Sequence, residues 1–203
     1  MNTRLLWVGA GLLALVGAAM AALLFFPKDD SFRGTLYDPA LPAPGFELTQ
    51  GNGSSFRLRE KRGVVTLLFF GYTSCPDVCP TTLSELRRVM DGLGADAARV
   101  QVVFVTVDPE RDTPEKLGQY VAMFNPSFIG LSGSVDALET VWRDYGVYRA
   151  VQQMPNSATG YLVDHTARLY VIDPDGNLRL SFSYGTAPDD ILHDVRLLLK
   201  SEE

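Results

Sequence analysis

The stretch that decides the fold is FGYTSCPDVCP, residues 70–80. It continues an almost unbroken apolar run, VVTLLFF at residues 64–70, which is typical of a strand buried on both faces. Proline suits the first turn of a helix, so we predict a helix that begins at residue 80 or 81. The two cysteines of the chain therefore lie between a buried strand and a helix. In α/β proteins, this is a position where chemistry is often located.

The rest of the chain predicts an alternation of strands and helices. Two buried strands joined by a helix imply a parallel pair with a right-handed crossover. The sequence Gly51-Asn52-Gly53 predicts an N-terminal β-hairpin. We therefore predict an α/β, thioredoxin-like fold with an N-terminal hairpin and an inserted helix. The other predicted elements are strands at residues 101–107, 147–152, 161–163, 168–172 and 178–184, and helices at about 113–124, 134–145 and around 191–199.

The N-terminus predicts a membrane anchor. Residues 5–26 carry no charge, and 22 residues span about 33 Å as a helix, enough to cross a hydrocarbon core of about 30 Å. The positive-inside tendency places residues 1–4 in the cytoplasm and the rest on the periplasmic or another extracytoplasmic side. Ala19-Met20-Ala21 resembles a signal-peptide cleavage site, but the apolar run exceeds the usual length of about 7–15 residues. A retained transmembrane anchor is therefore the favoured interpretation.

The remaining chain divides into a linker and one domain. Residues 27–44 contain four prolines and little periodicity, which predicts a linker, and residues 45–203 suit a single domain with a sizeable core. The net charge is −6 and the isoelectric point is about 4.9, with no long basic run, which argues against nucleic acid as a partner. Two cysteines are too few for a disulfide-stapled scaffold.

Three kinds of site fit two cysteines with this spacing. A structural disulfide would close a very short loop, which gives little entropic stabilisation. A dithiol/disulfide enzyme usually carries C-x-x-C, and the longer spacer weakens that interpretation without excluding it. A metal site is the third, because two thiolates are soft ligands that favour Cu(I) and also accept zinc. We also expect Cys79 near the helix N-cap, where free N–H groups and the helix dipole lower a thiol pKa.

The two histidines are not equally good candidates for a metal ligand. His193 falls on the polar face of the last helix, which predicts a solvated surface side chain. His165 precedes the strand at residues 168–172, and in a thioredoxin-like fold that loop lies beside the N-terminus of the first helix. We therefore expect His165 to approach Cys75 and Cys79. Two thiolates and one imidazole would form a three-coordinate site that suits Cu(I), and an added ligand would serve Cu(II).

Four motifs resemble the Sco/SenC family of membrane-anchored copper chaperones for cytochrome c oxidase assembly. They are FGYTSCPDVCP at 70–80, VDPERDTPE at 107–115, YLVDHT at 161–166 and YVIDPDG at 170–176, in the family's order and spacing. The resemblance extends from about residue 37 to the end. Thioredoxin enzymes as a group carry a cis-proline opposite the cysteine pair, and this chain has no proline between Pro155 and Pro174. That departure counts against a general disulfide reductase.

The resemblance implies a domain that binds copper, as Cu(I) or Cu(II), through Cys75, Cys79 and His165. The copper would pass by ligand exchange to the dinuclear copper centre of cytochrome c oxidase subunit II, which is binding rather than enzymatic turnover. The alternative is a thiol-disulfide reductase that uses Cys75 and Cys79 to keep the cysteines of that centre reduced. A peroxidase-like activity is a third, less favoured interpretation.

Further residues and partners follow from the same comparison. Asp164 or a backbone carbonyl is expected to orient the His165 ring. Asp77, Asp108 and Asp112 are candidates for contact with the site or with a partner, although helix capping alone would also explain Asp112. An exported thiol reductase is an implied partner, because the cysteines must be reduced to bind copper. Another periplasmic copper carrier is a further candidate partner.

Overall fold

The computed structural model describes residues 16–17, 31–155 and 159–200. The chain divides into two units, Met1–Ser31 and Phe32–Glu203. In the first unit, Val16, Gly17 and Ser31 are described, and Val16 and Gly17 are helical. The predicted anchor at residues 5–26 therefore lies, apart from these two positions, outside the described residues. None of the helices within the described ranges has the length and apolar character needed to cross a membrane.

The second unit is built on a mixed sheet of eight strands in the order β1-β10-β9-β4-β5-β6-β2-β3. Three strands are parallel, namely β4 (Val65–Gly71), β5 (Val100–Thr106) and β6 (Ile129–Ser132). The antiparallel strands are β9 (Arg168–Ile172), β10 (Asn177–Ser183), β1 (Thr35–Pro42), β2 (Glu47–Gln50) and β3 (Ser55–Arg57).

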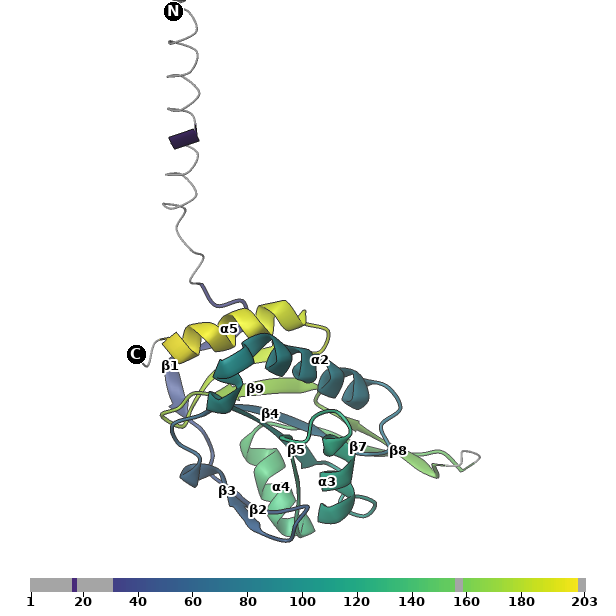
Figure 1. The fold of residues 1–203 in the computed structure, drawn as a ribbon. Helices are drawn as coiled ribbons and strands as arrows, with labels where there is room; N and C mark the ends of the chain where they lie inside the picture. The colour runs from purple at the N-terminus through teal and green to yellow at the C-terminus, as the bar shows by residue number, and fades with distance from the viewer. Residues whose placement is uncertain (1–15, 18–30, 156–158, 201–203) are drawn as a thin grey trace, which may run out of the picture. The chain divides into compact units, whose positions relative to one another are not determined.

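Helices cover both faces of this sheet, as Figure 1 shows. One face carries α2 (Val78–Leu93) and α5 (Pro188–Lys200), and the other carries α3 (Pro114–Ala122) and α4 (Val135–Asp144). Every residue of β4 is buried, as expected of a strand between two helical layers. The succession β4-α2-β5, followed later by the hairpin β9-β10 and α5, is the thioredoxin-like arrangement predicted from the sequence.

A separate two-stranded sheet lies beside the main one (Figure 1). It consists of β7 (Arg149–Gln153) and β8 (Tyr161–His165), which pair antiparallel with Arg149 opposite His165. No main-sheet strand pairs with either of them in the described part of the chain. The position of this hairpin against the main sheet therefore depends on contacts made by side chains and not on strand pairing.

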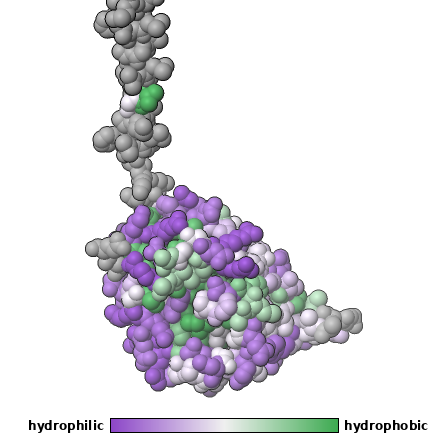
Figure 2. Space-filling view, viewed as in Figure 1, coloured by the Kyte–Doolittle hydropathy of each residue, from purple (hydrophilic) through white to green (hydrophobic). Residues whose placement is uncertain are grey.

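The surface seen in Figure 2 is mostly hydrophilic, with apolar residues gathered near the middle of the visible face. Helix α2 buries an apolar stripe against the sheet side of the core, formed by Leu83, Leu86, Val89 and Met90. In the described part of the second unit, the other helical elements are two short 3₁₀ segments, Leu58–Glu60 and Gly94–Arg99.

Local signals predicted several elements correctly. The hairpin around Gly51-Asn52-Gly53 is formed by β2 and β3. Ser134 caps α4 by accepting a hydrogen bond from the Ala137 N–H. Thr113 does the same for α3 through the Lys116 N–H.

The structure differs from the predicted elements in three places. The interval predicted as a linker contains β1, an edge strand with mostly exposed side chains, where proline is tolerated and apolar periodicity is absent. Strand β6 has only four residues and was not predicted. Helix α2 begins at Val78, two residues before Pro80. Proline is tolerated there because the N–H groups in the first turn of a helix have no partner within the helix.

Candidate metal centre

The cysteine turn connects the end of β4 to the start of α2. Cys75 is half-buried and its N–H donates to the carbonyl of Tyr72 at 3.2 Å, while Cys79 is fully buried in the first turn of α2. Both thiols are free. The Cys79 N–H donates to Cys75 Sγ at 3.4 Å, so the end of the helix is directed at the sulfur of Cys75. A Cβ at Gly71 would lie 2.7 Å from Cys79 Sγ, and glycine there leaves room for the sulfur.

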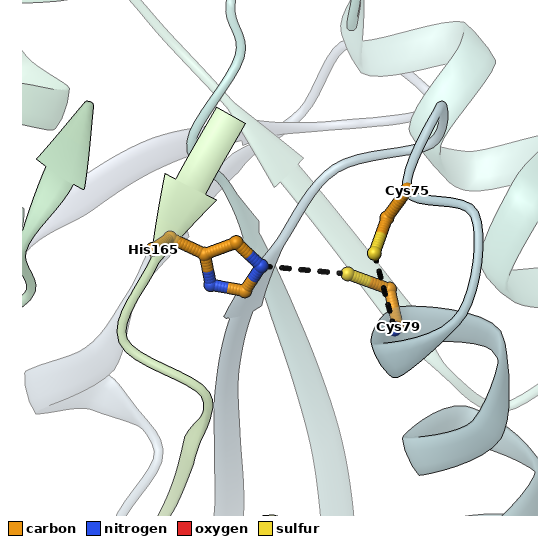
Figure 3. A group of neighbouring side chains, drawn as sticks. All are labelled: Cys75, Cys79 and His165. Atoms are coloured by element: carbon orange, nitrogen blue, oxygen red, sulfur yellow. Dashed lines mark hydrogen bonds between the residues drawn. The ribbon is translucent and has the colours of Figure 1, made fainter. Parts of the chain in front are cut away.

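His165 is the last residue of β8 and reaches toward the sulfurs, as Figure 3 shows. Its Nε2 lies 3.7 Å from Cys79 Sγ, although 86 positions separate the two residues. Its Nδ1 lies 3.1 Å from the carbonyl oxygen of Thr166. Because a carbonyl only accepts, Nδ1 carries the proton in a neutral ring and the lone pair of Nε2 faces the cysteines.

The three side chains form one compact group. The Sγ atoms of Cys75 and Cys79 and a ring nitrogen of His165 all lie within 4.8 Å of one another. The expected approach of His165 to the cysteine pair is therefore present in the structure. The rings of Phe69 and Tyr72 meet the imidazole edge-on, with centroids 6.3 and 5.9 Å away. These rings restrict the orientation of the imidazole.

The two thiols have opposite electrostatic environments. The hydrogen bond from the Cys79 thiol lowers the pKa of Cys75 to about 4, against the effect of partial burial, with help from His165 and the N–H groups of Cys79 and Asp77. The same thiol–thiol contact, followed by burial, raises the pKa of Cys79. The metal-free pair therefore holds one thiolate, on Cys75, and one proton, on Cys79.

This assignment corrects the expectation that the helix end lowers the pKa of Cys79. Cys79 lies inside the first turn and its side chain turns into the core. Within that turn, the Cys79 N–H donates instead to the sulfur of Cys75, which precedes the helix. A helix N-terminus does lower the pKa of a nearby thiol, and here that thiol is Cys75.

Asp112 fixes the cysteine turn from the loop that follows β5. Its carboxylate is fully buried and accepts hydrogen bonds from the Thr73 N–H at 3.0 Å and the Thr73 hydroxyl at 2.5 Å. The hydroxyl of Thr106, at the end of β5, donates to it at 2.9 Å. The turn that carries Cys75 is thereby tied to the neighbouring strand.

Arg111 and Asp108 hold the histidine hairpin from the same loop. Arg111 Nη1 donates to the carbonyls of Thr159 and Tyr161, each at 3.0 Å, and its Nε donates to the buried carboxylate of Asp108. The Tyr161 hydroxyl also donates to Asp108, at 2.8 Å, and the guanidinium stacks on the Tyr161 ring at 3.7 Å. From the other strand, Arg149 Nε donates to the carbonyl of Val107.

One short loop, Val107 to Asp112, therefore contacts both halves of the metal centre. Asp112 holds the cysteine side, and Arg111 with Asp108 holds the histidine side. Asp108 and Asp112 in this loop were candidates for contact with the site or with a partner. The structure shows the carboxylates of Asp108 and Asp112 fully buried, so neither is an exposed contact. Nothing in the local sequence pattern indicated these hydrogen bonds, because they join residues 39 to 53 positions apart.

The remaining candidates lie as follows. Asp164 is exposed and accepts from Gln152 Nε2 at 3.0 Å, so the ring of His165 is oriented by the Thr166 carbonyl and not by Asp164. Asp77 is exposed at the start of α2, next to the cysteine turn, and accepts from the Thr81 hydroxyl at 3.4 Å. His193 is half-buried beside Asp194, with Nδ1 2.9 Å from the carboxylate, instead of fully solvated.

Comparison with known proteins gives consistent matches. The family model described as SCO1/SenC matches residues 36–200. The chain is 34% identical over 184 residues to the SCO2-like protein RP587 of Rickettsia prowazekii, which covers 89% of this chain and 90% of that protein. The match therefore extends over almost the full length of both chains.

Two solved structures share the fold. The solution structure of apo Sco1 from Thermus thermophilus matches with a TM-score of 0.75 and 41% identity, covering 84% of this chain and 99% of that one. The structure of Bradyrhizobium japonicum ScoI with copper bound matches with a TM-score of 0.69 and 39% identity, covering 76% and 97%.

Proposed function

Because the chain belongs to the SCO1/SenC family, we propose that it is a copper-binding metallochaperone for cytochrome c oxidase assembly. It binds copper through Cys75 Sγ, Cys79 Sγ and His165 Nε2. The observation that carries this proposal is the convergence of these three ligand atoms within 4.8 Å from two distant parts of the chain. Two thiolates and one neutral imidazole are a donor set that suits Cu(I).

The arrangement also suits release of the metal. Three protein ligands leave a side open, and Cys75 is only partly buried, so an incoming cysteine or histidine can reach the ion. Copper then passes by associative ligand exchange to the dinuclear centre of oxidase subunit II. The thiolate is the ligand, so the pair must first be reduced, which implies an exported thiol reductase as a second partner. Another periplasmic copper carrier is the proposed source of copper.

Residues 5–26 act as a retained anchor in this proposal, with residues 1–4 in the cytoplasm and the copper-binding domain on the extracytoplasmic side. The support is the length and lack of charge of that segment. Fractionation of cells and intact-mass analysis of the membrane-bound chain test it. A soluble product that begins at residue 22 would contradict a retained anchor.

One observation favours a second function, thiol-disulfide reduction. Cys75 combines partial exposure with a pKa lowered to about 4, chiefly by its hydrogen bond with Cys79, and such thiolates are reactive. The pair would reduce a disulfide of the oxidase copper centre and become oxidised itself.

A histidine replacement separates the two functions. His165→Ala removes one ligand but neither thiol, so it should abolish stable copper binding and leave disulfide reduction largely intact. His193→Ala is the matched control, because it removes the other histidine of the chain, on α5. Copper content of the reduced full-length protein, purified without oxygen, is the readout. Full copper affinity in His165→Ala would refute the three-ligand centre, and multiple turnovers on a disulfide substrate would favour the reductase.

A further inference from the structure

A cavity lies near the start of β4, at the opposite end of this strand from the metal centre. Its volume is about 540 Å³, and its lining includes Arg59, Lys61, Arg62, Thr66, Asp175 and Asn177. Thr66 stands near the start of β4 and the cysteine turn follows its end, so about 16 Å of strand separates them. The two sites are therefore distinct.

The lining is positively charged in an acidic protein. It contains three cationic side chains and one carboxylate, although the net charge of the whole chain is −6. In the described part of the chain, no carboxylate lies within ion-pair distance of Arg59, Lys61 or Arg62. The positive charge of the cavity is thus not neutralised by the protein itself.

The neighbouring Arg57 provides a contrast. It lies in the same stretch of chain, is exposed, and forms ion pairs with Glu47 at 2.9 Å and Glu60 at 3.3 Å. It does not line the cavity. Acidic partners are therefore present nearby in this segment, yet they leave the cavity-lining cations unpaired.

Two glycines leave space for the arginine side chains. The guanidinium of Arg62 lies over Gly176, in the β9–β10 turn, where a Cβ would be 3.8 Å from its Nε. The Arg59 side chain occupies the space beside Gly45, and any side chain there would collide with it.

We propose that this cavity binds a phosphate group. Guanidinium groups match phosphate oxygens with paired hydrogen bonds, and an ammonium group adds a point charge. Arg59 and Arg62 supply the paired donors, Lys61 supplies the point charge, and the Asn177 amide lies in the same lining. Asp175 is the one unfavourable group. The chemistry fits either free inorganic phosphate or the headgroup of an anionic phospholipid.

The experiment uses the reduced, copper-free full chain in a non-ionic detergent. Inorganic phosphate is one probe, and short-chain phosphatidylglycerol, with zwitterionic phosphatidylcholine as its counterpart of zero net charge, is the other. Backbone amide shifts of Gly63, Gly176 and Asn177 report binding. We expect a saturable shift at these amides, with phosphate if the ligand is the free anion and with phosphatidylglycerol alone if it is the lipid.

Three variants make the result decisive. Arg62→Ser should weaken binding by about tenfold or more, since a charged hydrogen-bonding partner is lost. Arg57→Ser removes the same charge outside the cavity and should leave the affinity nearly unchanged. Asp175→Asn should tighten binding. The proposal is overturned if neither probe gives a saturable shift, or if Arg57→Ser weakens binding as much as Arg62→Ser. Copper loading, measured separately, is expected to be the same in all three.

Discussion

Asp112 accepts hydrogen bonds from both the backbone N–H and the hydroxyl of Thr73, so the loop after β5 holds the turn that carries the cysteines. The adjacent Arg111 holds the strand that carries His165. The separation between sulfur and imidazole is thus determined by a segment that supplies no metal ligand. Residues of this kind orient metal ligands in many proteins and affect affinity when they are replaced.

The first prediction concerns Asp112→Asn. The amide cannot accept all the hydrogen bonds of a buried carboxylate, and its NH₂ group adds donors where donors already converge. We expect a loss of about 1–3 kcal/mol in the free energy of unfolding, together with faster copper release. Urea denaturation and stopped-flow transfer to a chelator measure the two effects. Asp96→Asn, at an exposed position, is the control and should change neither.

The second prediction concerns Arg111→Lys. Lysine keeps the charge but cannot donate at once to Asp108 and to the carbonyls of Thr159 and Tyr161. We expect copper affinity to fall by about tenfold, because the histidine strand is held less firmly. Competition with a Cu(I) chelator gives the affinity, and Arg87→Lys, an exposed residue of α2, is the control. An unchanged affinity would mean that the hairpin is held without Arg111.

The third prediction concerns the thiols. Because the pKa of Cys75 is lowered to about 4 and that of Cys79 is raised, alkylation at pH 6 should label Cys75 and spare Cys79. In Cys79→Ala, the main hydrogen bond to the thiolate is lost, so the pKa of Cys75 should rise and its labelling at pH 6 should slow. Mass spectrometry of the labelled chain measures both. Preferential labelling of Cys79 would reverse the assignment of the thiolate.

The fourth prediction is that copper affinity depends on pH, because protons compete with copper for its ligands. Binding displaces the proton held by Cys79, and protons also compete for the imidazole of His165, so affinity should fall as pH falls. Chelator competition at a series of pH values measures the trend. A flat profile would contradict the displacement of a proton from Cys79 by the metal.

The fifth prediction concerns Gly71→Ala. The added Cβ would stand 2.7 Å from Cys79 Sγ and 2.8 Å from the Phe104 ring, both in the tightly packed core. We expect a loss of about 1–3 kcal/mol in the free energy of unfolding, with reduced copper affinity from the displaced sulfur. Gly92→Ala is the control, because its nearest contact is the end of the flexible Leu192 side chain. Thermal unfolding with and without copper distinguishes the effect on the site from the effect on the fold.

The amino-acid sequence by itself determined the elements with strong local signals. The unbroken apolar run became β4, the turn residues became hairpins, and Thr113 and Ser134 became helix caps. Such features depend on side-chain periodicity and on hydrogen bonds within about four residues. Edge strand β1 and short β6 escaped prediction because their pairing partners, not their own composition, make them strands.

The metal centre was likewise predicted in part from the sequence and decided in part by the tertiary structure. The sequence supplied the residue types, two cysteines and a histidine, and a topological argument placed them near one another. Only the tertiary structure decided which sulfur carries the negative charge, which group orients the imidazole, and which loop holds the two halves together. These outcomes depend on burial and on hydrogen bonds between residues far apart in the chain, and neither is encoded in a local pattern.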